Sequence, residues 1–249
     1  MSYHTRERRE SLNKSKVFDT KILVSCGLLS GISIILTRFF SYMIPLAGFP
    51  VLRIGFGDIP VIISGILFGP IAGALTGGVS DILGFIINPM GGPYIPGMTV
   101  GAILRGLLPG LIYWVIRNHK VKINFHIINV IFSLIMAVGA IYVPMTQNIE
   151  ISNFILILYG LVALAFIVLP IILGIIVKSK DSLYSFDKIL FVVTVGYFII
   201  SLIINTFVLA ITYEKGFLAF LPGRIIAGLV IIPLHSFIIF VLSRWFKHI

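Results

Sequence analysis

Long apolar runs occupy most of the sequence and set the strongest limit on what it can fold into. A helix needs about 20 apolar residues to cross a hydrocarbon core of ~30 Å. Only 11% of the residues are charged and 58% are hydrophobic, whereas soluble domains carry about 25% charged residues. A soluble enzyme, a disordered chain and a nucleic-acid-binding module are thus all poor interpretations of this composition. The sequence predicts an all-α, multi-pass membrane helical bundle with spans at 22–44, 98–116, 123–142, 151–177, 189–211 and 217–242.

The segment 57–87 needs a different interpretation because it is too long for one span. As a straight helix it would reach ~46 Å, well beyond the hydrocarbon core. Gly69 and Pro70 stand near its middle, and a proline inside a helix removes a hydrogen bond and clashes with the preceding turn. We therefore expect two shorter helices over 58–68 and 70–87, which brings the predicted number of spans to eight.

The basic residues support this topology independently, because Lys and Arg collect on the cytoplasmic side of membrane proteins. With eight spans and a cytoplasmic N-terminus, 14 of the 19 Lys and Arg residues lie inside, including the cluster at 117–122. A single span over 57–87 would place that cluster outside. Both termini are therefore predicted to be cytoplasmic, and topology explains most of the net charge of +10. No basic stripe interleaved with aromatic residues is present, so nucleic-acid binding is not expected.

Polar residues within the predicted spans are candidates for a binding site. Ionisable groups inside a membrane cost ~2.5–3.5 kcal/mol on insertion scales and usually face a cavity or a partner. Asp81 and Arg105 lie well within spans, Arg224 lies near the outer end of the last span, and Asn205 interrupts an apolar run. The alternative is a structural ion pair such as Asp81–Arg105. Arg38 lies in the outer third of the first span, where its side chain can reach the membrane interface.

Two predicted outer connections, 45–58 and 88–99, are rich in glycine and proline. These residues favour tight turns. Each connection ends at a polar residue beside a predicted helix start, Asp58 in the first and Thr99 in the second. We expect them to form the walls or lids of a pocket that faces outward. The alternative is that they are ordinary turns with helix caps.

Small residues form two stripes along the predicted helices. Gly27 and Gly31, with Ser30 beside them, lie on one face of the first span, where another helix backbone can approach closely. This face fits a partner subunit or, alternatively, packing within the chain. Glycines also recur every four residues over 65–77. We expect this second stripe to pack the helices over 58–68 and 70–87 together.

Motifs for enzymatic chemistry are missing from the sequence. It has no G-x-x-x-x-G-K-[ST] phosphate loop, no H-E-x-x-H metal motif and no G-x-S-x-G nucleophile elbow. A single cysteine, Cys26, excludes an intrachain disulfide framework and a cysteine-based metal site. We therefore expect no catalytic residues, no metal and no cofactor. Without a phosphate loop the chain is not expected to hydrolyse ATP, so uphill transport would need a partner or an ion gradient.

A family resemblance covers about three quarters of the chain. Two stretches carry the resemblance: LRIGFGDIPVIISGILFGPIAGALTGGVSDILGFIINPMGGPYIPGMTVGAILRGLLPGLIY at 52–113, and NTFVLAITYEKGFLAFLPGRIIAGLVIIPLHS at 205–236. Both closely resemble the S components of energy-coupling-factor (ECF) vitamin transporters, specifically the folate family. The resemblance implies a six-helix bundle in the cell membrane that binds a vitamin at its outer face. It further implies partnership with a transmembrane T component and two cytoplasmic ATPases, with Gly27, Ser30 and Gly31 facing the T component.

The chain departs from the six-helix pattern over 121–181, which adds two spans. We interpret residues 1–249 as a single membrane domain. Residues 1–21 form a basic cytoplasmic segment, 22–120 the first four core helices, 121–181 an inserted pair and 182–249 the last two core helices. We expect the inserted pair to pack on the lipid-facing side of the bundle.

The residues that we predict to bind the vitamin lie in the outer connections and at the polar positions of the spans: Arg53, Gly55, Phe56, Gly57, Asp58, Asp81, Tyr94, Pro96, Gly97, Thr99, Arg105, Asn205 and Arg224. A folate has a pterin edge that suits a carboxylate, here Asp81 or Asp58, because two carboxylate oxygens can accept from adjacent N–H groups. Its glutamate tail suits Arg53, Arg105 or Arg224, because the guanidinium fork matches a carboxylate.

Other candidate residues have neutral roles. Tyr94 and Phe56 are candidates for stacking or closing groups, and Thr99 and Asn205 for hydrogen bonds. Gly55, Gly57, Pro96 and Gly97 would shape the outer loops. Alternatives to folate are another vitamin, such as pantothenate or riboflavin, or a proton-coupled secondary transporter with Asp58 or Asp81 as its proton site. An intramembrane enzyme is disfavoured because no cluster of acids or nucleophile–base pair is present.

Overall fold

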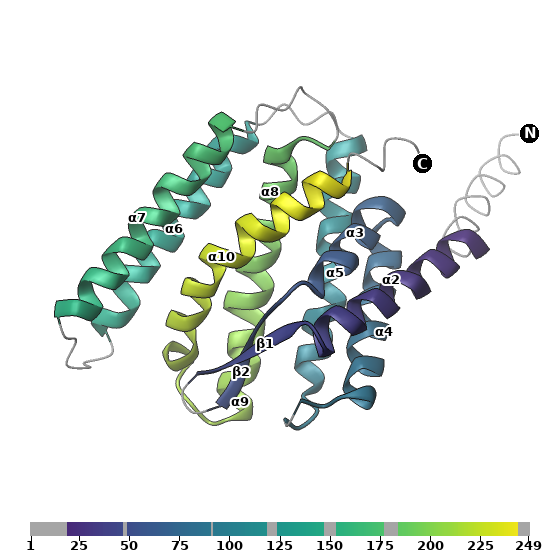
Figure 1. Ribbon diagram of the computed structural model, residues 1–249, viewed down its shortest axis with the longest axis horizontal. Coiled ribbons are helices and arrows are strands. Elements are labelled where there is room, and N and C mark those ends of the chain that lie inside the picture. Colours follow the sequence, from purple (N-terminus) through teal and green to yellow (C-terminus); the bar gives the residue numbers. More distant parts are fainter. Residues whose placement is uncertain are drawn as a thin grey trace, which may run out of the picture. The chain divides into compact units, whose positions relative to one another are not determined.

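The computed structural model describes residues 19–46, 49–90, 92–118, 124–146, 153–176 and 184–243. Helices dominate these residues, and a two-stranded sheet follows the first helix (Figure 1). The elements are α2 (Thr20–Arg38), β1 (Ser41–Leu46), β2 (Phe49–Gly55), α3 (Asp58–Phe68), α4 (Pro70–Ile87), α5 (Pro96–Asn118), α6 (Phe125–Thr146), α7 (Asn153–Ile176), α8 (Phe186–Gly196), the π-helix η2 (Tyr197–Asn205), α9 (Thr206–Thr212) and α10 (Phe217–Ser243).

The break inside 57–87 is confirmed at the predicted place. Helix α3 ends at Phe68 and α4 begins at Pro70. Gly69 between them has φ +96°, a conformation that residues with a side chain rarely adopt. Pro70 fits because the first helical residue needs no backbone N–H and has the φ that proline imposes.

The predicted end of the first span is wrong. Helix α2 stops at Arg38, and the residues expected to complete the span up to 44 form strand β1 instead. Strand β2 pairs with β1, so the predicted outer connection 45–58 is largely a hairpin. Residues 41–45 are apolar at most positions. A short apolar run of this kind fits a strand and a helix end equally well.

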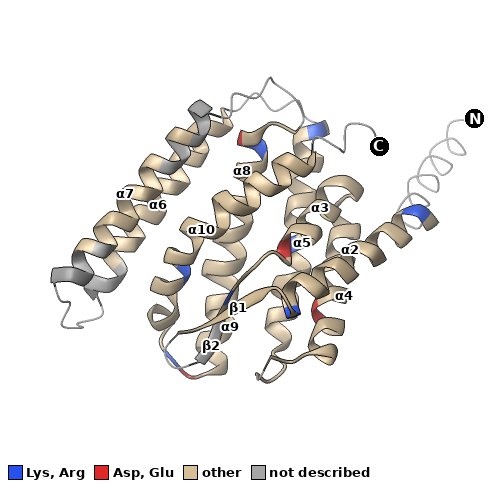
Figure 2. Ribbon diagram, viewed as in Figure 1, with Lys and Arg blue, Asp and Glu red and all other residues tan. Residues whose placement is uncertain are grey.

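Six spans of the described residues are long and apolar enough to cross a membrane: Thr20–Arg38, Pro70–Ile87, Pro96–Asn118, Phe125–Tyr142, Phe186–Thr212 and Phe217–Ser243. Figure 2 shows how little of the helical ribbon carries charge. The chain is thus a multi-pass membrane protein. Helix α3 has 11 residues and would reach only about 16 Å, so the full count of eight spans and the placement of both termini stay predictions.

Contacts within the chain define two compact units. Unit 1 comprises Met1–Phe40 and Gly55–Val115, and unit 2 comprises Ser41–Ile54 and Ile116–Ile249. The subdivision of a single membrane domain given above stays a prediction.

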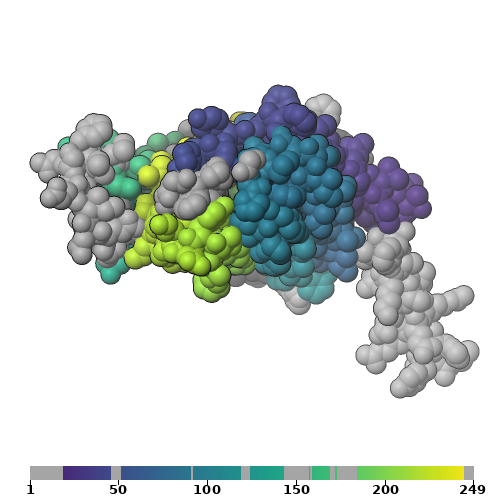
Figure 3. Space-filling model, turned by 90° about the horizontal axis from the view of Figure 1, so that it is seen from below, coloured from purple at the N-terminus to yellow at the C-terminus, as the bar shows by residue number. Residues whose placement is uncertain are grey.

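Close backbone contacts hold unit 1 together. A Cβ atom on Gly65 would lie 2.2 Å from the carbonyl oxygen of Gly106, and one on Gly73 would lie 2.7 Å from the Cα of Gly65. The glycine stripe therefore packs α3 on α4, as predicted, and it also packs both helices on α5. Helix α2 lies against α4, where Ser30 Oγ donates to the Thr76 carbonyl at 3.4 Å. The purple atoms of α2 and the blue-teal atoms of α4 adjoin in the space-filling view (Figure 3).

In unit 2, α6 and α7 run side by side as an antiparallel pair (Figure 1). Helix α10 packs on α8, η2 and α9. The hairpin joins this unit through Leu52, which is buried in a cluster with Ala227 and Ile231 of α10. This contact fixes β2, and with it Arg53, within unit 2.

Candidate functional site

Asp58 and Arg105 form an ion pair in unit 1, with Nη1 of Arg105 2.7 Å from Oδ1 of Asp58. Asp58 is the first residue of α3, and a carboxylate is stabilised at a helix N-terminus by the unpaired N–H groups there. The preceding Gly57 is held by Ser33, whose Oγ donates to the Gly57 carbonyl at 2.7 Å. A Cβ on Gly57 would lie 1.7 Å from Oγ1 of Thr37. Only glycine therefore lets the chain approach α2 this closely.

A second polar group links α4, α5 and the connection between them. Thr99 Oγ1 donates to Oδ2 of Asp81 at 2.8 Å, and the Tyr94 hydroxyl lies 2.8 Å from the same Thr99 oxygen. The Tyr94 ring packs against Phe85 with ring centroids 5.1 Å apart. Thr99 is buried, whereas Tyr94 is 43% exposed. This chain of contacts holds a carboxylate beside an accessible aromatic ring.

Arg38, the last residue of α2, contacts Asp81 of this polar group. Its Nη1 donates to the Asn88 carbonyl at 2.9 Å, and its Nη2 lies 3.9 Å from Oδ1 of Asp81. A Cβ on Gly84 would lie 2.8 Å from Nε of Arg38. The guanidinium therefore occupies space that only a glycine leaves open.

The ion pairs differ from the one we considered. Arg105 does not pair with Asp81. It pairs with Asp58, and Asp81 pairs with Arg38. Arg38 was also expected to reach the membrane interface, but it is only 6% exposed. Sequence reasoning missed its role, because which arginine meets which carboxylate depends on how the helices pack.

Unit 2 contains a separate polar cluster around Arg224, which is 3% exposed. Arg224 Nη1 donates to Ser201 Oγ at 3.1 Å and to the Ser201 carbonyl at 3.2 Å. The Tyr197 hydroxyl donates to the Arg224 carbonyl at 2.6 Å. Asn205 is 1% exposed, and its Oδ1 has no hydrogen-bond partner among the described residues. A buried acceptor left in this way is uncommon in proteins.

Tyr197, Ser201 and Asn205 all lie in the π-helix η2. Short π segments are rare and often mark functional sites. Sequence reasoning found Asn205 but missed Tyr197 and Ser201. Their spacing of four residues within an apolar run was the available signal, because it lines three polar groups along one side of a helix.

The predicted binding residues therefore divide between the units. Asp58 with Arg105, and Asp81 with Thr99 and Tyr94, come together in unit 1. Unit 2 contains Arg53, Asn205 and Arg224. The remaining predicted residues lie at the edges of elements in unit 1: Gly55, Phe56, Gly57, Pro96 and Gly97. Phe56 is 37% exposed, and Pro96 and Gly97 begin α5.

The small-residue face of α2 is open at two of its three predicted positions. A Cβ on Gly27 or Gly31 would meet no atom within 4 Å. The neighbouring Leu28 is 62% exposed. Ser30 differs, because it is 4% exposed and donates to Thr76 of α4. Its side chain packs inside unit 1 and does not belong to the open face.

Comparison with known proteins places the chain in a family. Residues 17–180 match the family described as "ECF-type riboflavin transporter, S component", which is more than half of the chain. The chain belongs to this family. The family consists of transporter components, so the protein is a membrane transport subunit and not an enzyme. The match ends at residue 180 and so includes all but the last residue of the pair 121–181, whose assignment as an insertion stays a prediction.

Two curated proteins are similar to parts of this chain. The folate transporter FolT of Clostridium novyi (strain NT) is 34% identical over 129 residues, covering 51% of this chain and 65% of that protein. An uncharacterized MG098 homolog of Mycoplasma pneumoniae is 30% identical over 135 residues, covering 53% of this chain and 26% of the relative. The chain thus spans less than two thirds of either curated relative.

Among solved structures, one of FolT bound with folic acid is similar at 24% identity and a TM-score of 0.38. The alignment covers 64% of this chain and 90% of the FolT chain. This structural similarity is too low to support the family assignment, which depends on the family match over residues 17–180 and on the six apolar helices.

Proposed function

We propose that this S component binds folate with high affinity and delivers it to an ECF-type importer. The observation that supports folate is the 34% identity to a folate transporter. The family description names riboflavin, which makes riboflavin the first competing ligand to test. Pantothenate is a further alternative. The chemistry of the two polar groups in unit 1 supports a ligand with a hydrogen-bonding ring and an anionic tail.

Asp81 is proposed to accept from the pterin ring. Its Oδ2 already accepts from Thr99 at 2.8 Å, while its Oδ1 lies 3.9 Å from Arg38, beyond hydrogen-bonding distance. A carboxylate oxygen can accept more than one hydrogen bond, so Asp81 keeps acceptor capacity for ring N–H groups. The exposed ring of Tyr94, linked to Thr99, is proposed to stack on the pterin, with Phe56 as a second aromatic contact.

Arg105 is proposed to bind the glutamate tail. One of its five N–H donors is directed to Asp58, and its side chain is 28% exposed. A ligand carboxylate would compete with Asp58 for the guanidinium. Asp58 is thus proposed to hold Arg105 in place, or to take the ring itself. Gly55, Gly57, Pro96 and Gly97 would shape the backbone around this group.

Arg53, Asn205 and Arg224 of unit 2 are also proposed as ligand-binding residues. Arg224 carries a buried charge that Ser201 holds in a fixed orientation, and the buried Oδ1 of Asn205 has no donor among the described residues. A ligand N–H is one group that would satisfy it. Single substitutions of these three residues test their roles separately from unit 1.

The open face of α2 is proposed as the contact for a transmembrane T component, which would connect the chain to two cytoplasmic ATPases. Gly27 and Gly31 have open space above them, and small residues allow helix backbones to approach closely in membranes. A dependence of uptake on these partners distinguishes this mechanism from a proton-coupled secondary transporter, which would work without an ATPase.

The direct test of the ligand is mass spectrometry of small molecules that co-purify with the full chain. We expect folate in the wild-type protein and its loss in Asp81→Asn. Asp19→Asn is the matched control, because Asp19 is exposed at the start of α2. Riboflavin in place of folate would overturn the substrate while leaving the family unchanged.

A further inference from the structure

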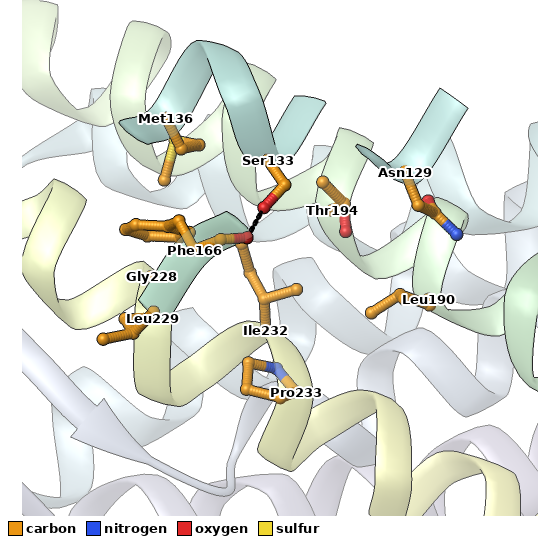
Figure 4. Close-up of a pocket in the computed structure, with 10 residues that line it drawn as sticks. All are labelled: Asn129, Ser133, Met136, Phe166, Leu190, Thr194, Gly228, Leu229, Ile232 and Pro233. Atoms are coloured by element: carbon orange, nitrogen blue, oxygen red, sulfur yellow. Dashed lines mark hydrogen bonds between the residues drawn. The ribbon is translucent and has the colours of Figure 1, made fainter. Parts of the chain in front are cut away.

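Unit 2 contains a small cavity among α6, α7, α8 and α10, and its lining includes none of the residues assigned above to the vitamin. Its volume is about 40 Å³. A water molecule needs ~10–15 Å³ of such space, so the cavity has room for one or two water molecules and for nothing as large as a vitamin. Figure 4 shows hydrocarbon side chains such as Met136 and Leu190 beside the polar side chains of Asn129, Ser133 and Thr194.

The cavity lies at the depth of the membrane interior. Ser133 stands eight residues after the start of α6, and Thr194 stands eight residues after the start of α8. At 1.5 Å per residue both lie about 12 Å along their helices, well inside a hydrocarbon core of ~30 Å. Both helices belong to segments that are long and apolar enough to span a membrane. A polar group at this depth has to find its hydrogen-bond partner inside the protein, because lipid supplies none.

Two prolines release backbone carbonyls at this cavity. Pro170 of α7 and Pro233 of α10 have no N–H, so the carbonyls four residues earlier, those of Phe166 and Leu229, lose their helical donor. Phe166, Leu229 and Pro233 all line the cavity. The Phe166 carbonyl has a replacement donor, because Ser133 Oγ donates to it (dashed line in Figure 4). The Leu229 carbonyl needs an equivalent donor.

The polar side chains of the lining are suited to holding water. The Thr194 hydroxyl is directed among the lining side chains (Figure 4) and can both donate and accept. The Ser133 oxygen still has a lone pair to offer after Ser133 donates to Phe166. Asn129 is 3% exposed, and its buried Oδ1 has no hydrogen-bond partner within the described part of the chain, which is uncommon in proteins. A buried water molecule typically makes about three hydrogen bonds, and this lining offers that number.

We propose that the cavity binds one or two ordered water molecules within the membrane-spanning part of the protein. A water molecule here would donate to the Leu229 carbonyl and to the Ser133 oxygen, and would accept from the Thr194 hydroxyl. It would thereby connect α6, α8 and α10, so that the α6–α7 pair is attached to the rest of unit 2 by polar as well as apolar contacts. The proposal is independent of which vitamin the protein binds.

The test is X-ray hydroxyl-radical footprinting of the full chain in nanodiscs, in which radicals formed from a bound water molecule oxidise the side chains that touch it. Mass spectrometry locates the oxidised residues. We expect oxidation at Phe166 and Leu229. Thr194→Ile removes the hydroxyl and fills the space, so it should reduce this oxidation at least about tenfold, equivalent to about 1.4 kcal/mol of affinity for water. Thr212→Ile, at an exposed position of α9, is the matched control and should leave it unchanged.

Monodispersity and helical content show whether each variant folds. Pro233→Leu is the second variant, because it gives the Leu229 carbonyl a helical N–H and fills part of the cavity. Its control is Pro222→Leu, in the same helix but outside the cavity lining. No oxidation of Phe166 and Leu229 in the wild-type protein would mean a dry cavity and would overturn the proposal. Unchanged oxidation in a folded Thr194→Ile or Pro233→Leu protein would overturn it as well.

Discussion

Arg38 provides the sharpest test of how unit 1 is held together. Its side chain is only 4% exposed and lies against Asp81 and the Asn88 carbonyl. We consider Arg38→Met, which keeps much of the aliphatic stem next to Gly84 and removes the charge. The variant loses the 2.9 Å hydrogen bond to Asn88 and leaves Asp81 without its cation.

The magnitude follows from these contacts. A hydrogen bond from a charged group contributes about 1.5–3 kcal/mol, and breaking a buried ion pair by removing one partner costs about 3–5 kcal/mol. Asp81 keeps its hydrogen bond from Thr99, and its side chain is 20% exposed. We therefore expect the free energy of unfolding to fall by about 3 kcal/mol, the lower end of the range for a broken buried ion pair. For a protein of this size 1 kcal/mol shifts the midpoint of thermal unfolding by roughly 2–4 °C. Arg38→Met should therefore lower it by roughly 6–12 °C.

The assay is thermal unfolding of the purified protein in detergent, with two comparisons. Arg105→Met removes an ion pair whose side chains are 28% and 36% exposed. Solvent screening limits the contribution of such a pair to the free energy of unfolding to about 1 kcal/mol. The unfolding midpoint of Arg105→Met should therefore fall by only roughly 2–4 °C. The double variant Arg38→Met/Asp81→Leu removes both charges and should recover part of the loss. A midpoint for Arg38→Met within 2 °C of wild type, or no recovery in the double variant, would refute the reasoning.

Three further predictions concern packing, the partner and the ligand. Gly106→Ala should prevent folding, because its Cβ would lie 1.9 Å from the Gly73 carbonyl oxygen, whereas Gly160→Ala meets no atom within 4 Å. Yield of monodisperse protein compares the two. Gly27→Leu should abolish vitamin uptake by cells with vitamin binding intact, since a bulky side chain separates helix backbones. Equal loss of both would show internal packing. Thr99→Val should weaken folate binding about fivefold to thirtyfold, the equivalent of ~1–2 kcal/mol for one hydrogen bond, and calorimetry measures it. Unchanged affinity would remove Thr99 from the site.

Local chemistry explains which parts of the fold the sequence predicts. The break at Gly69 is local, because proline excludes the helical hydrogen bond at its own position. Hydropathy identifies the long helices because each must bury its own backbone polar groups in lipid. The hairpin at 41–55 was missed because a short apolar run does not separate strand from helix. Its position depends on Leu52 packing against α10, far along the chain.

The candidate site was predicted by residue type and not by pairing. Asp81, Arg105 and Arg224 stand out because a charge in an apolar run is costly. The free-energy cost of a buried charge does not determine which oppositely charged residue pairs with it. Arg38 meets Asp81 only because Gly84 leaves room for the guanidinium. Ser201, which orients Arg224, was missed although its four-residue spacing from Tyr197 and Asn205 was an available signal.

The central claim, that this chain is a folate-binding S component, is tested most directly by titration calorimetry of the purified full chain with folate and with riboflavin. The account predicts that folate binds with a dissociation constant below about 1 µM, equivalent to more than ~8 kcal/mol, and that riboflavin neither binds nor displaces it. Riboflavin binding in this range without heat from folate would contradict the account.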